Sequence, residues 1–172
     1  MKDRRWLFAV FMIGMLVLDQ VTKHWARTIL VERQRPGFPI PGVLELTLTY
    51  NKGIAFGMMQ GAGILMAPIA LCIAGAALVY SLKNPRESRW TLAAMGMLAA
   101  GALGNLIDRV FMGKVTDMIY VTAINFPVFN IADACITSAA IMLMITWAKD
   151  ALKPAEGPSS NHGSETAENP AP

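Results

Sequence analysis

Four long stretches without charged side chains dominate this sequence of 172 residues. A helix that crosses a bilayer needs about 20 predominantly apolar residues. The stretch over residues 53–82 has 30 uncharged residues, so its first ten or so are expected to have another role. The other three stretches contain 13, 18 and 15 uncharged residues and continue into neighbouring sequence of low charge. The predicted transmembrane helices lie at about residues 6–24, 62–82, 90–110 and 131–149.

The composition supports a membrane protein and excludes several other classes. Hydrophobic residues make up 54% of the chain and charged residues only 16%, whereas a soluble domain has roughly 25% charged residues. The net charge of +3 is small and scattered, so no nucleic-acid binding is predicted. Cys72 and Cys135 lie in apolar stretches, and two histidines are too few for a zinc site. We therefore predict no disulfide, no metal and no other cofactor.

Basic residues are densest near the chain ends and between the second and third apolar stretches. Three lie within the first five residues, three lie within 83–89, and Lys149 and Lys153 follow the last stretch. The two sides carry eight and seven basic residues, but the density favours cytoplasmic termini. The first stretch could instead be a cleaved signal peptide, although no small-residue cleavage site follows it. Residues 153–172 are rich in Pro, Glu, Ser and Asn, which is typical of a disordered tail, here cytoplasmic.

Residues 1–152 are predicted to form one domain, a mainly α membrane fold of four transmembrane helices. The segments at about 33–60 and 114–129 are expected to build a small extracytoplasmic β element. From Val43 to Tyr50, leucine and tyrosine side chains alternate with Glu and Thr, which is the period-two pattern of a half-buried strand. The aromatic and β-branched residues of 118–129 could supply partner strands.

Four aspartates lie at or near the outer ends of the predicted spans: Asp19, Asp108, Asp117 and Asp133. A carboxylate at the centre of a transmembrane helix costs roughly 2.5–3.5 kcal/mol, and less near the interface. The pattern Asn-x-x-Asp occurs twice, at Asn105–Asp108 and Asn130–Asp133. Gly101, Asn105 and Arg109 follow one another at intervals of four and share a helix face, where Gly101 also suits close helix packing. Acidic and amide groups gathered at one membrane edge indicate a functional site.

Paired carboxylates support one specific kind of chemistry. Two carboxylates held close together cannot both ionise, so one of them keeps a proton. The ionised group can take a proton from a water molecule that attacks a carbonyl, while the protonated group polarises that carbonyl and then helps to protonate the leaving amine. Serine, cysteine and zinc mechanisms of hydrolysis each lack a required residue in this sequence. Ser138 has no nearby lysine within an apolar stretch, Cys135 has no histidine base, and no His-Glu-x-x-His helix occurs.

Five short motifs occur in order: Asp19–Lys23, Asn51–Phe56, Gly104–Arg109, Val115–Asp117 and Phe129–Asp133. Together they resemble the motifs of the lipoprotein signal peptidase (signal peptidase II) family, over about Asp19 to Ile136. The resemblance implies an aspartyl endopeptidase of the bacterial inner membrane, with four spans, an extracytoplasmic β-cradle, an active site towards the periplasm and no cofactor. The implied substrates are diacylglyceryl-modified prolipoproteins, cut just before the lipidated cysteine. Membrane lipids and peptide-like antibiotic inhibitors are the other implied partners.

The resemblance implies that Asp117 and Asp133 form the catalytic dyad. The residues implied to line or support the site are Asp19, Lys23, Asn51, Gly101, Asn105, Arg109 and Asn130. Two positions depart from the family pattern: Ala100 stands where a second glycine is common, and Met118 where an aromatic residue is frequent. Both departures concern packing and leave the dyad unchanged. Without the resemblance, the residues alone do not decide whether Asp117 or Asp108 is the partner of Asp133.

Structural roles remain alternatives for several of these residues. Asp19 could pair with Lys23 one helical turn away. Asp108 could form a structural ion pair, and Arg109 could extend to the lipid headgroups. Residues 53–60 could lie on the outer leaflet as a short amphipathic lid over the site, or could simply begin the second span.

Two other functions fit parts of the sequence. A small proton-coupled membrane transporter subunit could use intramembrane Asp and Asn side chains as a relay, but the acids cluster at one membrane edge and do not reach its middle. A noncatalytic membrane scaffold could bind a partner through the predicted strand and the aromatic loop. Neither function accounts for five motifs in order.

Overall fold

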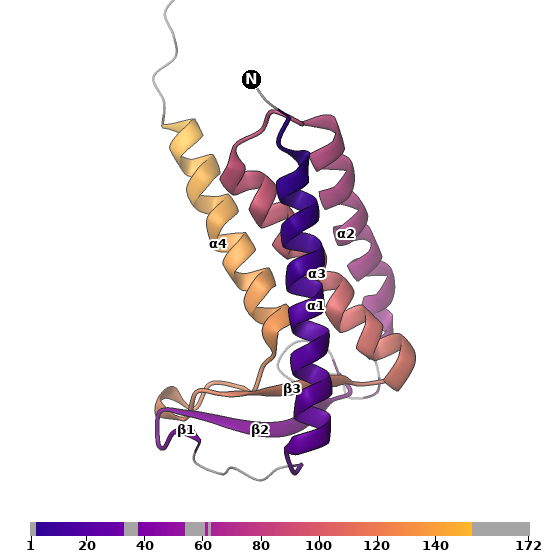
Figure 1. The fold of residues 1–172 in the computed structure, drawn as a ribbon, viewed down its shortest axis with the longest axis vertical. Coiled ribbons are helices and arrows are strands. Elements are labelled where there is room, and N and C mark those ends of the chain that lie inside the picture. The colour runs from indigo at the N-terminus through magenta and orange to yellow at the C-terminus, as the bar shows by residue number, and fades with distance from the viewer. Residues whose placement is uncertain (1–2, 33–37, 54–60, 62, 153–172) are drawn as a thin grey trace, which may run out of the picture.

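The computed structural model describes residues 3–32, 38–53, 61 and 63–152. Four helices run side by side, and a small sheet lies across one end of the bundle (Figure 1). The helices are α1 (Arg5–Ile29), α2 (Met66–Lys83), α3 (Arg89–Met112) and α4 (Ile131–Ala151). All four helices are long and apolar enough to cross a membrane, when α2 is taken together with the short helical turn η2 (Gly63–Leu65) that precedes it. The predicted mainly α membrane fold with a small β element is confirmed.

Helix α3 is the centre of the bundle. Of its most apolar 18 residues, 72% are buried inside the protein, against 17–22% for the other three helices. Small residues make this burial possible because they let neighbouring helices approach closely. The buried small residues of α3 are Ala93, Ala94, Gly96, Ala99, Ala100, Gly101, Ala102 and Gly104. A methyl group at Gly96 would lie 2.6 Å from the carbonyl oxygen of Phe8, so α1 and α3 touch backbone to backbone there.

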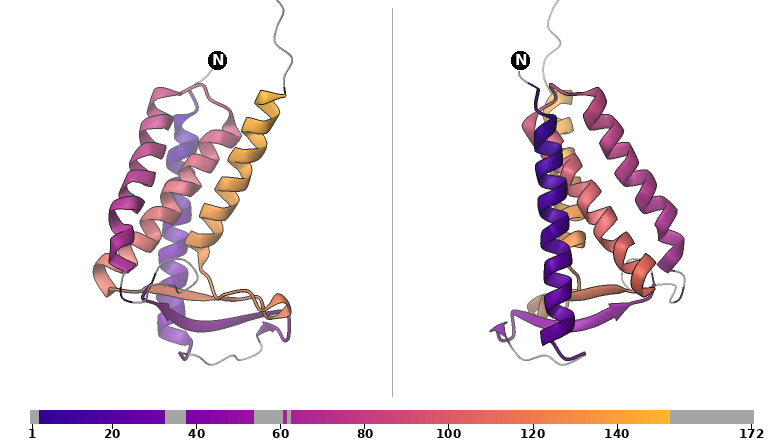
Figure 2. Two further views of the ribbon diagram at one scale, coloured as in Figure 1. Left: turned by 180° about the vertical axis from the view of Figure 1, so that it is seen from behind. Right: turned by 45° about the vertical axis from the view of Figure 1, so that its right-hand side comes forward.

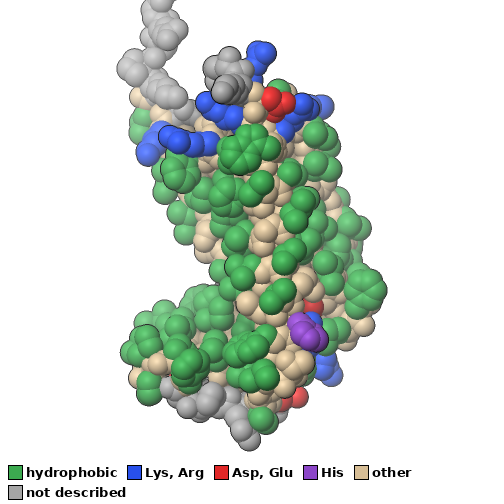
Figure 3. Space-filling view, in the orientation of Figure 1, with side chains coloured by type: hydrophobic (Ala, Val, Ile, Leu, Met, Phe, Trp, Pro, Cys, Tyr) green, Lys and Arg blue, Asp and Glu red, His purple; other side chains and the backbone are tan. Residues whose placement is uncertain are grey.

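The outer helices expose large apolar side chains along their length (Figure 3). Val10, Ile13 and Val17 of α1 are all more than half exposed, as are Leu71 of α2 and Met144 of α4. A water-soluble protein would bury such a surface, whereas acyl chains solvate it in a bilayer. The apolar surface therefore marks the part of the bundle that lies in lipid.

The sheet consists of β1 (Pro39–Ile40), β2 (Leu44–Asn51) and β3 (Val115–Tyr120), all antiparallel and in that order. The strand predicted over Val43–Tyr50 is confirmed as β2. The partner strand expected from the second loop is β3, which also forms a bridge between Ile119 and Phe129. In two further views the sheet crosses the end of the bundle beside the last turns of α1 (Figure 2).

The alternation expected along β2 is interrupted at its middle. Thr47 is 2% exposed and Leu48 is 4% exposed, although neighbouring residues of a regular strand face opposite sides. The register of β2 against β3 shifts between Leu46 and Thr49, so the strand is irregular at this point. Both neighbours are buried because of this irregularity, and β2 does not present one polar and one apolar face throughout.

Helix α1 continues beyond the apolar stretch that predicted it. The expected span ended near residue 24, whereas the helix ends at Ile29. The side chain of Lys23 is 0% exposed and that of Arg27 is 20% exposed, and both lie within 4 Å of the Asp108 carboxylate on α3. These ion pairs compensate the buried charges, so the helix continues past its apolar part to the level of the sheet.

Two sequence-based predictions fall outside the described residues. They are the disordered tail over 153–172 and most of the lid over 53–60, of which the structure describes Gly53.

We expect Gly101→Ala to lower the free energy of unfolding by about 1–3 kcal/mol. The added methyl group would lie 2.5 Å from the carbonyl oxygen of Ala132 and 2.7 Å from Cγ1 of Ile136, so α4 must move away from α3. Thermal unfolding of the purified protein in detergent measures the change. Gly14→Ala is the matched control, because this glycine of α1 faces open space and alanine is the better helix former. Equal losses of stability would contradict the close contact between α3 and α4.

Candidate active site

A cavity of about 670 Å³ opens where the sheet meets α3 and α4. Its wall is mostly apolar. The lining residues are Thr49, Tyr50, Asn51, Asn105, Arg109, Val115, Asp117, residues 126–129, Asp133, Ala134, Ile136, Thr137 and Ser138. Two acids from different elements, Asp117 of β3 and Asp133 of α4, therefore line one cavity. Asp19 and Asp108 do not line it.

Asp117 is 4% exposed, and its Oδ1 accepts a hydrogen bond of 2.7 Å from Nδ2 of Asn130. Burial, and after it the negative charge of Asp133, raises the pKa of Asp117 to about 7. The hydrogen bond from Asn130 and the charges of Lys23 and Arg109 oppose this shift without cancelling it. Asp117 therefore keeps its proton at pH values where an ordinary aspartate is ionised.

Asp133 is held by the start of its own helix. Asn130 precedes α4, and its Oδ1 accepts the backbone N–H of Asp133 at 3.0 Å. In return, Oδ2 of Asp133 accepts the backbone N–H of Asn130 at 3.2 Å. This reciprocal pair is a capping box, which satisfies two N–H groups that would otherwise lack partners at the helix end. The second Asn-x-x-Asp pattern of the sequence thus fixes where the carboxylate of Asp133 lies.

Asn130 also joins the two acids of the cavity. It is fully buried, and its Nδ2 donates to Asp117 while its backbone N–H donates to Asp133. The same Nδ2 lies 3.1 Å from Oδ1 of Asn105. Neither acid can shift without disturbing this amide.

Asn105 connects the acids to α1. Its Nδ2 donates to Oδ1 of Asp133 at 2.8 Å. Its Oδ1 accepts a hydrogen bond of 2.9 Å from Nζ of Lys23. Because the ammonium group of Lys23 can only donate, it fixes which end of the Asn105 amide faces Asp133.

The pair of Asp19 and Lys23 is a buried ion pair at 3.0 Å. The i,i+4 pairing considered from the sequence is confirmed, and Asp19 also reaches another helix. Its Oδ1 accepts the backbone N–H of Ala132 at 2.9 Å, in the first turn of α4. The carboxylate packs directly on Gly104, where any side chain would collide with it. Asp19 therefore ties α1 to both α3 and α4 behind the cavity.

The contacts of Asp108 among the described residues are structural. Its Oδ2 lies 3.6 Å from Nζ of Lys23 and accepts the backbone N–H of Thr116 at 2.9 Å. Its Oδ1 lies 3.4 Å from Nη1 of Arg27. The structural ion pair considered from the sequence is confirmed. The geometry thus brings Asp117, and not Asp108, to the cavity beside Asp133.

Asn51 and Arg109 line the cavity, whereas Gly101 lies behind it at the contact with α4. Oδ1 of Asn51 accepts the backbone N–H of Gly53 at 2.9 Å. The guanidinium of Arg109 donates to the backbone oxygens of Asn105 and Gly53, each at 3.4 Å. Its buried Nε has no partner among the described residues. Arg109 thus lies at the cavity wall and is held there by the backbone of Asn105 and of Gly53.

Several residues of the site region were missed by sequence reasoning. Thr137 is one helical turn after Asp133, so helical spacing could have found it, whereas Ser138 was considered only as a nucleophile and lines the cavity one turn after Ala134. Arg27 follows Lys23 by four residues, so helical spacing from Lys23 could have predicted that Arg27 lies on the same face. The packing of Phe126 against Phe129, with ring centroids 5.7 Å apart, had no signal in the sequence beyond aromatic content.

Comparisons with known proteins agree with this geometry. A family model described as signal peptidase (SPase) II matches residues 11–149. The chain belongs to the signal peptidase II family. This confirms the family resemblance and makes the chain a protease of a bacterial membrane. Signal peptidase II membership does not favour the transporter alternative.

Similar proteins of known name cover most of the chain. A lipoprotein signal peptidase of Deinococcus radiodurans is 38% identical over 151 residues, which cover 81% of this chain and 78% of the relative. One from Microcystis aeruginosa is 38% identical over 146 residues, covering 84% and 93%. A solved structure described as a bacterial membrane enzyme, determined by the in meso method at 2.3 Å resolution, is 32% identical and covers 87% of this chain and 92% of its own. Its TM-score against this chain is 0.81.

We expect Asp117→Asn to have little effect at pH 3.5 and to stabilise the fold progressively as the pH rises, most strongly at pH 8.5. The folded-state pKa is raised from 3.8 to about 7. The wild-type protein therefore loses stability as pH rises towards 7, where the unfolded chain is already ionised. One pKa unit corresponds to about 1.4 kcal/mol, so a rise from 3.8 to about 7 gives the variant an advantage of roughly 3–4 kcal/mol at pH 8.5. Thermal unfolding at both pH values tests this. The exposed Asp3→Asn is the control, and a pH-independent effect of Asp117→Asn would contradict the raised pKa.

Proposed function

We propose that this protein is an aspartic endopeptidase that removes signal peptides from diacylglyceryl-modified prolipoproteins, cleaving before the lipidated cysteine. One observation carries the proposal: Asp117 and Asp133 line the same cavity and are bridged by Asn130. Family membership supports the substrate class, because the similar proteins are named lipoprotein signal peptidases.

The two acids would share one proton. Asp117, whose pKa is raised to about 7, is assigned as the protonated partner. Asp133 accepts N–H donors from Asn105 and Asn130 and is assigned as the base. In the attack, Asp133 takes a proton from water as the water oxygen bonds to the scissile carbonyl carbon, and Asp117 donates a hydrogen bond to the carbonyl oxygen. Collapse of the tetrahedral intermediate breaks the C–N bond, and the proton held by Asp133 passes to the leaving amine.

The neighbouring polar residues would position this dyad. Lys23, held by Asp19, orients Asn105, and Asn105 orients Asp133. We assign Arg109 and Asn51 to the cavity wall, where their polar groups can meet the substrate backbone. Gly101 would act indirectly, because it lets α4 approach α3 closely enough for the contact between Asn105 and Asp133.

The apolar wall suits a substrate that remains in the membrane. Ala134, Thr137 and Ser138 form the α4 side of the cavity, and Thr137 and Ser138 are exposed towards the lipid region. A signal peptide could therefore enter sideways from the bilayer while its acyl chains stay in lipid. Fixing the scissile bond beside the dyad in this way supplies a large part of the rate. Peptide-like antibiotic inhibitors are proposed to occupy the same cavity.

In the proposed orientation both termini are cytoplasmic in the bacterial inner membrane, and the sheet and the cavity face the periplasm. Lys and Arg side chains gather at the end of the bundle where the chain begins (Figure 3), which supports this orientation. Residues 1–152 would form the peptidase domain, followed by a cytoplasmic tail over 153–172.

Asp117→Asn and Asp133→Asn should each lower the cleavage rate by about 10²–10⁴-fold, the usual contribution of an acid–base group. The assay follows cleavage of a purified lipid-modified prolipoprotein by the full chain in detergent. Asp3→Asn is the matched control, since Asp3 is exposed at the opposite end of the bundle, and it should change the rate by less than about twofold. A wild-type rate in either dyad variant would refute the assignment.

The cleavage rate should fall as pH rises above about 7. The raised pKa of Asp117 means that its proton is present below this pH and is lost above it. We expect kcat/KM to decrease roughly tenfold for each pH unit on this limb. A substrate without groups that titrate between pH 6 and pH 9 makes the profile interpretable. A constant kcat/KM up to pH 9 would contradict a protonated Asp117.

A further inference from the structure

A second cavity lies at the opposite end of the bundle from the two acids. Its volume is about 720 Å³, and its lining residues are Arg4, Trp6, Leu7, Ser88, Arg89 and Trp90. They come from the start of α1 and from the turn that leads into α3. The backbone N–H of Arg4 donates to the carbonyl oxygen of Pro85 at 2.8 Å, which joins these two segments. The cavity has no part in the peptidase mechanism proposed above.

The acids near this cavity already have partners. Asp3 pairs with Arg5 at 2.6 Å. The carboxylate of Glu87 accepts the hydroxyl of Tyr80 at 2.8 Å and the backbone N–H of Ser88 at 2.7 Å. Neither carboxylate forms an ion pair with the arginines of the cavity among the described residues. Within the described residues, the two cavity arginines therefore have no carboxylate within ion-pair distance.

Two guanidinium groups carry the positive charge of the cavity. Nη1 of Arg4 reaches the backbone oxygen of Glu87 at the long distance of 3.5 Å. The guanidinium of Arg89 lies 6.0 Å from the ring centroid of Trp90 and is exposed. Two like charges on one cavity repel each other unless an anion lies between them. Arginine recognises phosphate oxygens particularly well, because its planar group can donate two parallel hydrogen bonds.

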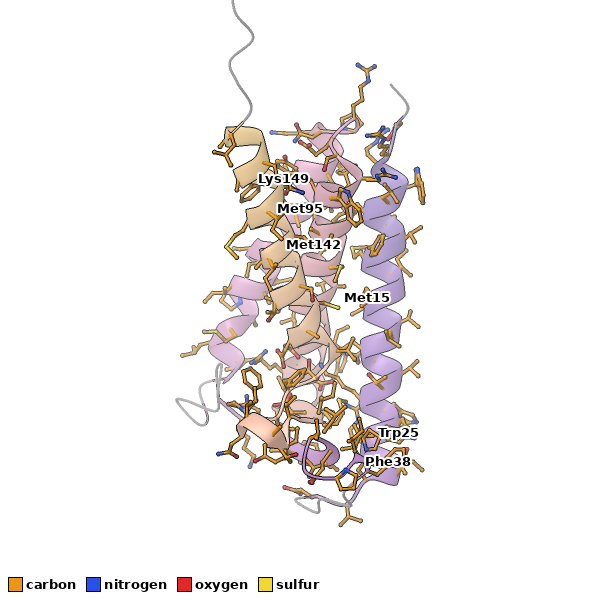
Figure 4. The ribbon with its side chains drawn as sticks, turned by 90° about the vertical axis from the view of Figure 1, so that its left-hand side faces the viewer. Met15, Trp25, Phe38, Met95, Met142 and Lys149 are labelled. Carbon is orange, nitrogen blue, oxygen red and sulfur yellow. The ribbon has the colours of Figure 1, made fainter. Side chains whose placement is uncertain are left out.

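The two tryptophans place the cavity at the membrane surface. Trp6 and Trp90 are each the second residue of their helix and are 60% and 59% exposed. Tryptophan side chains concentrate at the headgroup level of a bilayer, with the ring towards the acyl chains. Lys149 lies at the same end of the bundle, far from Trp25 and Phe38 near the sheet (Figure 4). The arginines therefore lie at the level of lipid phosphates.

We propose that this cavity binds the headgroup of an anionic phospholipid, with its phosphate between Arg4 and Arg89 and its acyl chains beside Trp6 and Trp90. The cationic groups select for negative charge, and the exposed indole rings distinguish a lipid from a free anion. The lipid belongs to the leaflet where α1 and α3 begin, the cytoplasmic one in the proposed orientation. By bridging the start of α1 and the turn before α3, a bound lipid holds two of the helices that carry the site at the other end.

The test uses the full chain in a neutral detergent, titrated with phosphatidylglycerol or with phosphatidylcholine of the same acyl chains. Native mass spectrometry counts bound lipids, and thermal unfolding reports their effect on stability. An arginine that contacts the phosphate of a bound lipid is expected to contribute about fivefold in affinity, whereas a basic residue outside the cavity is not. We expect Arg89→Gln to weaken phosphatidylglycerol binding about fivefold and Arg4→Gln with Arg89→Gln about 25-fold, with little change for phosphatidylcholine.

Lys83→Gln with Lys149→Gln is the matched control, since both lysines are exposed at the same end of the bundle and neither lines the cavity. It should change phosphatidylglycerol binding by less than about twofold. Arg89→Gln alone keeps the test valid if the double variant does not fold, because among the described residues the exposed Arg89 makes only the ring contact with Trp90. An equal loss in the control, equal binding of the two lipids, or displacement of the lipid by millimolar inorganic phosphate would each overturn the proposal.

Discussion

The buried ion pair between Asp19 and Lys23 is the interaction on which the rest of the site depends. Breaking a buried pair leaves an uncompensated charge and costs about 3–5 kcal/mol. Here each partner also holds another helix, because Asp19 accepts the N–H of Ala132 and Lys23 donates to Asn105. The pair therefore fixes α1, α3 and α4 relative to one another at the level of the cavity, in surroundings where water cannot replace a lost partner.

Small residues on α3 make this polar network possible. Gly101 and Gly104 remove side chains where α4 and the Asp19 carboxylate come closest. Larger residues would separate the helices by more than a hydrogen-bond length. The close approach of the helices thus has two results. It packs the apolar part of the bundle, and it brings the amides and acids within hydrogen-bonding distance of one another.

Much of the fold could be predicted from local patterns, and the choice between acids could not. The apolar stretches have the length of spans, and the alternation over Val43–Tyr50 indicated β2. The pairing of Asp19 with Lys23 follows from helical spacing. In contrast, Asp108 and Asp117 look alike in sequence, and only their contacts across the fold separate them: Asp108 pairs with Lys23 and Arg27, whereas Asp117 lines the cavity beside Asp133. The irregularity near Thr47 was likewise invisible, because it depends on the register against β3.

The order of the elements along the chain has a consequence for biogenesis. Asp117 is synthesised before α4, while Asn130 and Asp133 belong to the start of that last helix. A nascent chain with three helices in the membrane therefore has one acid, and lacks both its partner and the amide that bridges them. Only when the final helix has been inserted, and its first turn has docked on Asp19, are both acids of the proposed dyad in place. On the proposed mechanism, a partly inserted chain therefore has no peptidase activity towards its neighbours in the membrane.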